Sequence, residues 1–460
     1  MSTVVAEERT KDPSPPAPSL VMRLHFYAGI LIAPFILVAA LSGGLYALAP
    51  TIESVVYRDL LTTESTGPTQ SVAAQVRAAE SERPDLTVAA VRPASEPGET
   101  SRVLFTDPSL GESKRLAVFV DPVAGESVGQ SVVYGSSSSL PLRTWISEFH
   151  RHLHLGEPGR IYSELAASWM WIVALGGVVL WVRRHRRGGR LLTVDRSVSG
   201  RARTRNWHGA VGLWIAVGLV FLSATGLTWS KYAGDNISDL RSALNWTTPA
   251  TAASIGGSGA AAAGDHAGHD MSVSEVSRDV LDVNVGRIDS VLGTARSHGI
   301  DGKVEVSIPA EADTAFVVAQ TRQPFALSTS SVAIDGATNA IVDDNDFAEW
   351  PVAAKLAAWG IALHMGILFG VANQIVLALL ALALVTVVVR GYLMWWKRRP
   401  TARPPRRGGL RGLPRAHVVA VVVAALVLGW YVPLLGISLL AFLLVDALVG
   451  LRPSTTLESK

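Results

Sequence analysis

Apolar positions in this sequence gather into long runs, which polar segments separate. A helix needs about 20 apolar residues to cross a hydrocarbon core of about 30 Å. Runs of this length lie at 24–48, 163–182, 208–229, 363–389 and 416–449. Gly429, Pro433 and Gly436 interrupt the last run, which favours two short spans or a tight hairpin over one helix. The pattern therefore predicts a polytopic α-helical membrane protein with six helices.

Two long polar segments between these runs have the mixed pattern of α+β domains. In the first, residues 71–80 have a helical pattern, and 86–91, 102–105 and 115–121 have the pattern of strands. The second segment repeats this order, with a helix at 285–298 and strands at 304–308, 314–320 and 331–335. Turns are expected at 121-DPVAGE-126 and 335-DGATNA-340.

Composition and charge agree with a membrane protein and predict its orientation. Of all residues, 49% are hydrophobic and 17% are charged. Nine arginines and one acidic residue lie in 183–205, and eight basic residues and no acid lie in 397–415. Because basic loops stay in the cytoplasm, we expect both loops inside and the two α+β segments outside. The net charge of +3 follows from this topology, so binding to nucleic acid is not needed to explain it.

The predicted organisation alternates between membrane helices and polar segments. In chain order it comprises a disordered cytoplasmic tail (1–20), a first membrane helix (21–49), an extracytoplasmic domain (51–145), an interfacial segment with the second membrane helix (146–184), a cytoplasmic basic loop (185–205), a third helix (206–230), a second extracytoplasmic domain (231–350) with a flexible Gly/Ala/Ser-rich linker (250–270), a fourth helix (352–396), a second basic loop (397–415) and a helical hairpin (416–451).

The sequence also contains an internal repeat, which places four histidines in equivalent positions. The stretch 24-LHFYAGILIAPFILVAALSGGLYA-47 aligns with 207-WHGAVGLWIAVGLVFLSATGLTWS-230, and 149-FHRHLHLGEPGRIY-162 aligns with 363-LHMGILFGVANQIV-376. The alignment matches His25 with His208, Gly29 with Gly212, Ser42 with Thr225, Gly43 with Gly226, His150 with His364 and Gly156 with Gly370. The first two helices and the domain between them therefore resemble the next two helices and theirs.

These histidines predict a cofactor. The topology places His25 and His208 at one face of the membrane and His150 and His364 at the other, and ionisable residues at such depths are usually functional. Two imidazoles that face each other can ligate a b-type haem from both sides. The chain has no cysteine, which excludes thioether attachment and thiolate ligands. We therefore predict two haem b groups, with Gly29 and Gly212 allowing a flat macrocycle close to the backbone. The structural alternative is that these histidines only donate hydrogen bonds to carbonyls and pack helices.

Other histidines offer further ligands. His154 lies one helical turn beyond His150 and is an alternative axial ligand to it. The segment 265-DHAGHDM-271 supplies His266, His269 and Met271, which suit copper. Because this segment falls in the flexible tract, a solvated linker is the competing interpretation.

The residues together resemble a known family. The spacing H-x3-G at the start of the first and third helices, 42-SGG-44, 225-TGL-227, 149-FHRHLHLGEPGR-160 and 117-AVFVDPVAGE-126 are similar to those of the PepSY-associated transmembrane proteins. This family includes the iron-regulated membrane proteins and the siderophore reductases of the bacterial inner membrane. The resemblance covers 21–396 and implies a four-helix haem-binding core, here with a C-terminal helix pair, and two extracytoplasmic α+β PepSY-like domains. It implies that His25 pairs with His208, and His364 with His150 or His154.

The function expected from this resemblance is transmembrane electron transfer. We predict a dihaem b oxidoreductase that reduces an extracytoplasmic ferric siderophore, or another ferric or cupric chelate, and so releases the reduced metal. The sequence has no strand-linked G-x-G-x-x-G fingerprint, so we expect a cytoplasmic flavoprotein or a membrane quinol as donor. The alternative is a haem-free sensor or regulator that binds a partner outside the membrane and tolerates loss of His25 or His364.

Overall fold

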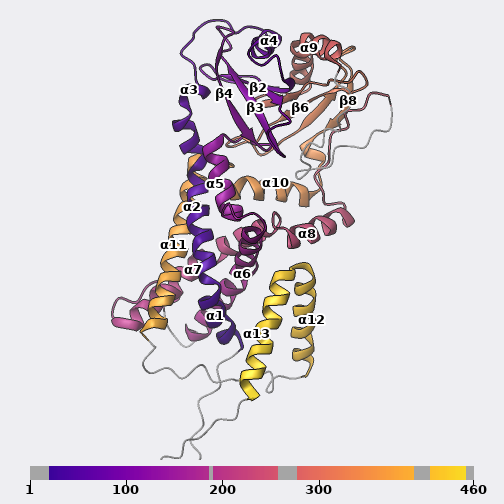
Figure 1. Ribbon diagram of the computed structural model, residues 1–460. Coiled ribbons are helices and arrows are strands. Elements are labelled where there is room, and N and C mark those ends of the chain that lie inside the picture. The colour runs from indigo at the N-terminus through magenta and orange to yellow at the C-terminus, as the bar shows by residue number, and fades with distance from the viewer. Residues whose placement is uncertain (1–19, 186–189, 257–276, 398–414, 452–460) are drawn as a thin grey trace, which may run out of the picture. The chain divides into compact units, whose positions relative to one another are not determined.

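The computed structural model describes residues 20–185, 190–256, 277–397 and 415–451 (Figure 1). Within these ranges, four helices are long and apolar enough to cross a membrane: α2 (Ala33–Val56), α6 (Glu157–His185), α7 (Gly200–Leu227) and α11 (Gly370–Trp396). The predicted tail, most of the second basic loop and most of the Gly/Ala/Ser-rich linker lie outside the described residues.

Two of the predicted membrane helices are each divided. Helix α1 (Leu20–Leu31) precedes α2, and α10 (Val352–His364) precedes α11. Between α10 and α11 the chain turns at Gly366 (φ 73°) and Gly370 (φ 54°), a left-handed conformation that favours glycine. The predicted segment 352–396 thus contains two helices, and His364 is the last residue of the first.

The C-terminal apolar run forms two helices, as its glycines and proline predict. Helix α12 (Arg415–Tyr431) ends just before Pro433, which is the first residue of α13 (Pro433–Leu451). The two helices lie side by side and approach closely, since a Cβ on Gly436 would lie 2.6 Å from Cα of Gly429 (Figure 1). The described apolar parts of α12 and α13 are shorter than the four long helices. Where the sequence predicts six membrane helices, the described residues thus contain four long ones and a shorter pair.

The chain divides into two compact units. One comprises 1–37, 164–224 and 384–460, and contains α1, most of α6 and α7, and the C-terminal hairpin. The other comprises 38–163 and 225–383. The helices that lie wholly within this second unit are α3 (Arg58–Leu61), α4 (Val72–Glu82), α5 (Pro141–His152), α8 (Tyr232–Ala243), α9 (Arg278–Ser297), α10 and the 3-10 helix η1 (Phe347–Glu349).

The second unit contains one antiparallel sheet of eight strands in the order β4-β3-β2-β1-β5-β6-β7-β8. The strands are β1 (Thr87–Arg92), β2 (Ser101–Thr106), β3 (Lys114–Val120), β4 (Ser127–Tyr134), β5 (Val304–Ser307), β6 (Phe316–Gln320), β7 (Ser331–Ile334) and β8 (Ile341–Asn345). Each repeat supplies a four-stranded meander, and the pairs Ala90–Ser307 and Val91–Val306 join β1 to β5. The two predicted domains therefore share a single sheet.

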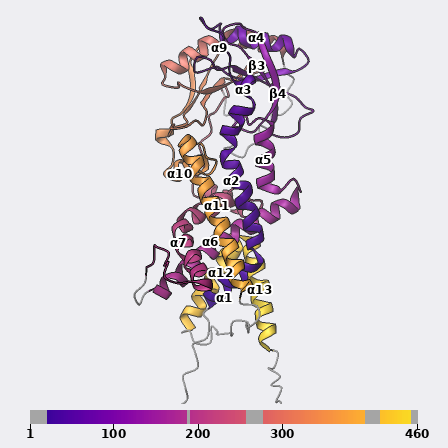
Figure 2. The ribbon, with the colours of Figure 1, turned by 90° about the vertical axis from the view of Figure 1, so that its left-hand side faces the viewer.

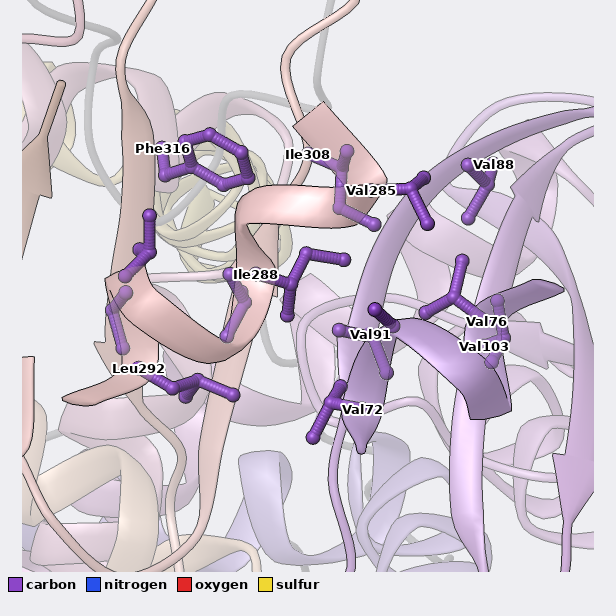
Figure 3. Close-up of a cluster of buried hydrophobic side chains, with 14 of the residues drawn as sticks. Val72, Val76, Val88, Val91, Val103, Val285, Ile288, Leu292, Ile308 and Phe316 are labelled. Carbon is purple, nitrogen blue, oxygen red and sulfur yellow. The ribbon is translucent and has the colours of Figure 1, made fainter. Parts of the chain in front are cut away.

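Helices α4 and α9 lie side by side on one face of this sheet (Figure 1; Figure 2). Their apolar faces fill a common core with the inward residues of the strands, shown in Figure 3 and including Val76, Val91, Ile288 and Phe316. The Asp289 carboxylate of α9 accepts hydrogen bonds from the first backbone N–H groups of α4, at 2.8 and 3.1 Å. The core and this cap tie the two repeats together.

Both predicted turns are present and repeat each other. The backbone N–H of Asp121 donates to the carbonyl of Glu126 at 2.9 Å, and that of Asp335 donates to Ala340 at 2.9 Å. In each turn the aspartate carboxylate also accepts a hydrogen bond from the backbone N–H two residues later, at 2.8 Å. The repeat seen in the sequence is thus also a repeat of backbone hydrogen bonding.

Asp121 is held strongly in its ionised form. Its carboxylate accepts hydrogen bonds from the hydroxyls of Ser65 and Thr63 and from the backbone N–H groups of Val123 and Ala124. Burial opposes ionisation, but these donors outweigh it and lower the pKa of Asp121 to about 2. The carboxylate fastens the loop before α4 to the turn after β3.

Candidate functional site: two histidine pairs

The first histidine pair lies within the first unit. His25 of α1 and His208 of α7 face each other with ring centroids 6.1 Å apart and ring planes at 79°. His25 Nδ1 lies 2.9 Å from the carbonyl oxygen of Val173 on α6, and His208 Nδ1 lies 2.9 Å from that of Val387 on α11. Each imidazole is therefore fixed by the backbone of a neighbouring membrane helix.

The second pair lies within the second unit. His150 of α5 and His364 of α10 have ring centroids 6.5 Å apart and planes at 48°. Here hydroxyl groups fix the rings, since Ser42 Oγ of α2 lies 2.9 Å from His150 Nδ1 and Thr225 Oγ1 of α7 lies 2.6 Å from His364 Nδ1. The rings of Trp229 and His364 pack in a T-shaped arrangement, with centroids 5.4 Å apart.

These partners determine which ring nitrogen carries the proton. A carbonyl oxygen only accepts, so His25 and His208 donate from Nδ1–H. Ser42 directs its own hydroxyl proton to the carbonyl of Val38 at 2.8 Å, which leaves its oxygen to accept from His150 Nδ1–H. In a neutral imidazole with Nδ1 protonated, Nε2 has a free lone pair. The Nδ1 contacts thus prepare Nε2 of these rings as a metal ligand.

The spacing within each pair fits one metal ion between two imidazoles. A metal–nitrogen bond of about 2 Å on each side, and about 1.2 Å from ring centre to Nε2, place the two centroids about 6.4 Å apart. The observed values of 6.1 and 6.5 Å lie on either side of this figure. Direct hydrogen bonding between two rings would bring the centroids closer, so each pair fits the axial ligands of a haem.

Glycines of the neighbouring helices determine how close the rings approach the backbone. A Cβ on Gly43 would lie 2.9 Å from Cε1 of His150, and one on Gly177 would lie 2.9 Å from Cε1 of His25. The glycines predicted to adjoin the macrocycle, Gly29 and Gly212, have no described atom within 4 Å of a Cβ. Space therefore remains beside Gly29 and Gly212, whereas Gly43 and Gly177 lie directly against the imidazoles.

The turn between α5 and α6 separates His150 from His154. Leu153 (φ 52°), His154 (φ 54°) and Gly156 (φ 62°) all have left-handed backbone, and such conformations cluster at functional sites. Gly159 is required here, because its Cβ would lie 1.8 Å from the carbonyl oxygen of His152. Helix α5 thus ends two residues after His150, and α6 begins only at Glu157.

His154 lies in this break between the helices, away from the pair. Its Nδ1 lies 3.5 Å from the Glu148 carboxylate, and its ring stacks on Trp145 with centroids 4.9 Å apart. It is exposed, whereas His150 is half-buried against His364. Burial, together with the nearby charge of Arg151, lowers the pKa of His152, whose ring lies beside that of His154. Of the two alternatives, the structure brings His150 to His364.

The remaining predicted ligands, His266, His269 and Met271, lie outside the described residues. Among the residues that are described, no group of three or more His, Cys, Asp or Glu side chains is arranged to hold a metal ion.

Sequence reasoning missed the Nδ1 partners, although the repeat contains them. Ser42 aligns with Thr225 just as His25 aligns with His208, and Val173 aligns with Val387 at the offset that matches His150 with His364. The aligned hydroxyls in an apolar run were a usable signal. The valines had none, since any residue type supplies a carbonyl.

Comparison with known proteins agrees with this architecture. The sequence model of the PepSY-associated TM region matches residues 22–398, which include all four paired histidines and the whole sheet. Comparison with curated proteins gave no significant match.

Proposed function

The chain belongs to the family of the PepSY-associated TM region, and on this basis we propose that it is a transmembrane dihaem b protein that reduces a metal chelate. The main support for the proposal is the arrangement of the four histidines, that is, their Nδ1 contacts and the spacing within each pair. Each has its Nδ1 engaged by a neighbouring helix, and each faces a partner at the distance two axial ligands require. A purely structural histidine has no need of such a partner.

His25 with His208, and His150 with His364, would each hold one haem b. Bound haem with two imidazole ligands supplies reversible one-electron chemistry and leaves no open iron position for oxygen. The protein's part is to orient the rings, to keep the proton on Nδ1 and to exclude water. Two sites divide the path across the bilayer into shorter electron transfers.

The proposed orientation places the N-terminus and both basic loops in the cytoplasm of a bacterium and the eight-stranded sheet outside its inner membrane. The positive charge of 183–205 supports this orientation. Electrons then enter near His25 and His208 from a cytoplasmic flavoprotein or a membrane quinol. They leave near His150 and His364, on the side of the sheet.

The proposed acceptor is a ferric siderophore or another ferric chelate, with a cupric chelate as the next choice. Ferric ion binds hard oxygen donors tightly, and ferrous ion, which has a lower charge, binds them less tightly. One electron per chelate therefore releases the metal without breaking a covalent bond in the chelator. Nucleic acid has no place in this scheme.

Anaerobic mixing of the reduced, detergent-purified protein with a ferric chelate and a ferrous-specific dye tests the proposal. We expect the reduced haem bands to decay as ferrous iron forms, one iron per electron. His154→Ala serves as the control that retains both bands. Purified protein without haem bands, producing no ferrous iron, would support the sensor alternative.

A further inference from the structure

A small positively charged cavity lies within the second unit. Its volume is about 180 Å³, and its lining includes Arg92, Arg143, Arg322, Ser136 and Gly366. Sites that enclose an entire small molecule are usually about 300–1,000 Å³. This cavity therefore accommodates one substituent of a ligand, with the rest of the ligand outside.

Arg143 is the unusual member of this lining. The residue is only 6% exposed, yet its Nε and Nη2 have no hydrogen-bond partner. The remaining Nη1 lies 3.6 Å from a Glu53 carboxylate oxygen, and that carboxylate also accepts the backbone N–H of Leu140 at 2.7 Å. A buried guanidinium with two unsatisfied nitrogens is costly. Two neighbouring donors such as Nε and Nη2 of one guanidinium can bind a carboxylate with two parallel hydrogen bonds.

The other two arginines add positive charge without filling this role. Arg92 donates a hydrogen bond from Nε to a Glu305 carboxylate oxygen at 2.6 Å and another from Nη2 to the Ser136 carbonyl at 2.7 Å. Arg322 donates to the Ser136 hydroxyl at 3.4 Å. None of the described residues that line the cavity is acidic. An anion that enters would therefore meet donors and positive charge from several sides.

Two of the lining residues of the cavity lie close in the chain to the histidines of the second pair. Arg143 precedes His150 by seven residues on α5, which is two helical turns, the same helix face and a rise of about 10 Å. Gly366 follows His364 by two residues. A group bound in the cavity would hold the remainder of its molecule near these histidines.

We propose that this cavity binds a carboxylate, or a similar oxyanion, of the metal chelate and so selects anionic substrates. The anion site itself stands on Arg143 and its neighbours. Only its description as a substrate site rests on the proposed function.

Isothermal titration of the full-length, detergent-purified protein with the gallium(III) complex of citrate tests this inference. The probe is an anionic carboxylate chelate that cannot be reduced, so binding is measured apart from electron transfer. Charge-assisted hydrogen bonds support a loss of affinity of about 10- to 100-fold in Arg143→Gln. Arg322→Gln changes a more accessible position and should lower the affinity for gallium citrate several-fold. It keeps the test valid if Arg143→Gln fails to fold.

Two controls accompany the titration. Arg83→Gln removes the same charge from an arginine outside the cavity that pairs with Asp85 at 2.7 Å, and should bind as the wild type does. The gallium complex of an uncharged trihydroxamate should show no dependence on Arg143.

The outcomes separate this inference from the proposed function. Protein that holds two haems but binds gallium citrate equally well in wild type, Arg143→Gln and Arg322→Gln overturns the anion site alone. Haem loss in Arg143→Gln with unchanged citrate affinity also overturns it, because the arginine then serves the haem's own carboxylates. Colourless protein whose citrate affinity depends on Arg143 supports the anion site and removes the haem proposal.

Discussion

A single added methyl group should remove one haem site and leave the other. In Gly43→Ala the new Cβ would lie 2.9 Å from Cε1 and 3.4 Å from Nδ1 of the His150 ring, where ordinary contacts begin at 3.4 Å. About 0.5 Å of overlap must be relieved. Helices α2 and α5 pack against each other and cannot easily move apart, so the His150 ring has to tilt. Tilting breaks the hydrogen bond between this ring and Ser42, the residue before Gly43 on α2.

The size of the effect follows from three terms. Overpacking costs about 1–3 kcal/mol, and the lost hydrogen bond costs about 1 kcal/mol more. Replacing glycine by alanine inside a helix returns about 1 kcal/mol. The net penalty of about 1–3 kcal/mol corresponds to haem binding that is about 5- to 150-fold weaker at the His150–His364 pair.

The assay is haem content per purified chain, measured as the pyridine haemochrome. Gly43→Ala should fall from two haems toward one. Gly391→Ala is the matched control, since its Cβ would lie 3.6 Å from Cε1 of His208, an ordinary contact, and it should keep both. Full haem content and an unchanged spectrum in Gly43→Ala would refute the proposed seating of His150. Equal losses in both variants would show that helix glycines matter for a reason other than ring contact.

Three further predictions concern single side chains. Thr225→Val keeps the shape but removes the partner of His364 Nδ1, and haem transfer to apomyoglobin should be about 10- to 100-fold faster from the affected site. His154→Ala should retain two haems and His150→Ala one, which difference spectra would show; the reverse would make His154 the ligand. The Asp121 carboxyl has a pKa of about 2 in the folded chain, against an ordinary value of 3.8. Between these two pH values the unfolded chain binds more protons than the folded chain. The free energy of unfolding therefore rises from about pH 2 to about pH 4 and is constant above about pH 4. Asp121→Asn should therefore lose about 2 kcal/mol at pH 7 and flatten that rise in thermal melts of the full chain, whereas an unchanged rise would assign it to other carboxyl groups.

Much of the fold could be predicted from apolar periodicity and the internal repeat. The four long helices, six of the strands and both aspartate turns follow from patterns within short windows. The edge strands β4 and β8 were missed because edge strands carry polar residues and glycine, as in 127-SVGQSVVY-134 and 341-IVDDN-345, which weakens the alternating pattern. The joining of β1 to β5 uses backbone hydrogen bonds between distant segments, which have no side-chain signature.

The site was predictable to the level of its histidines. Two pairs follow from the repeat, but the choice between His150 and His154 depends on left-handed backbone at residues 153–156, which hydropathy does not report. The break before α11 was also hidden, because 365-MGILFG-370 continues the apolar run. Its left-handed Gly366 and Gly370 become significant only once the backbone is seen.

An absorption spectrum of the detergent-purified protein, oxidised and dithionite-reduced, with haem quantified per chain, tests directly whether the four histidines hold two haems. We predict about two b-type haems in the wild type and about one in each of His208→Ala and His364→Ala, because each histidine serves a separate site. Colourless protein from haem-replete cells would contradict the two-haem proposal, as would a single haem that both substitutions abolish.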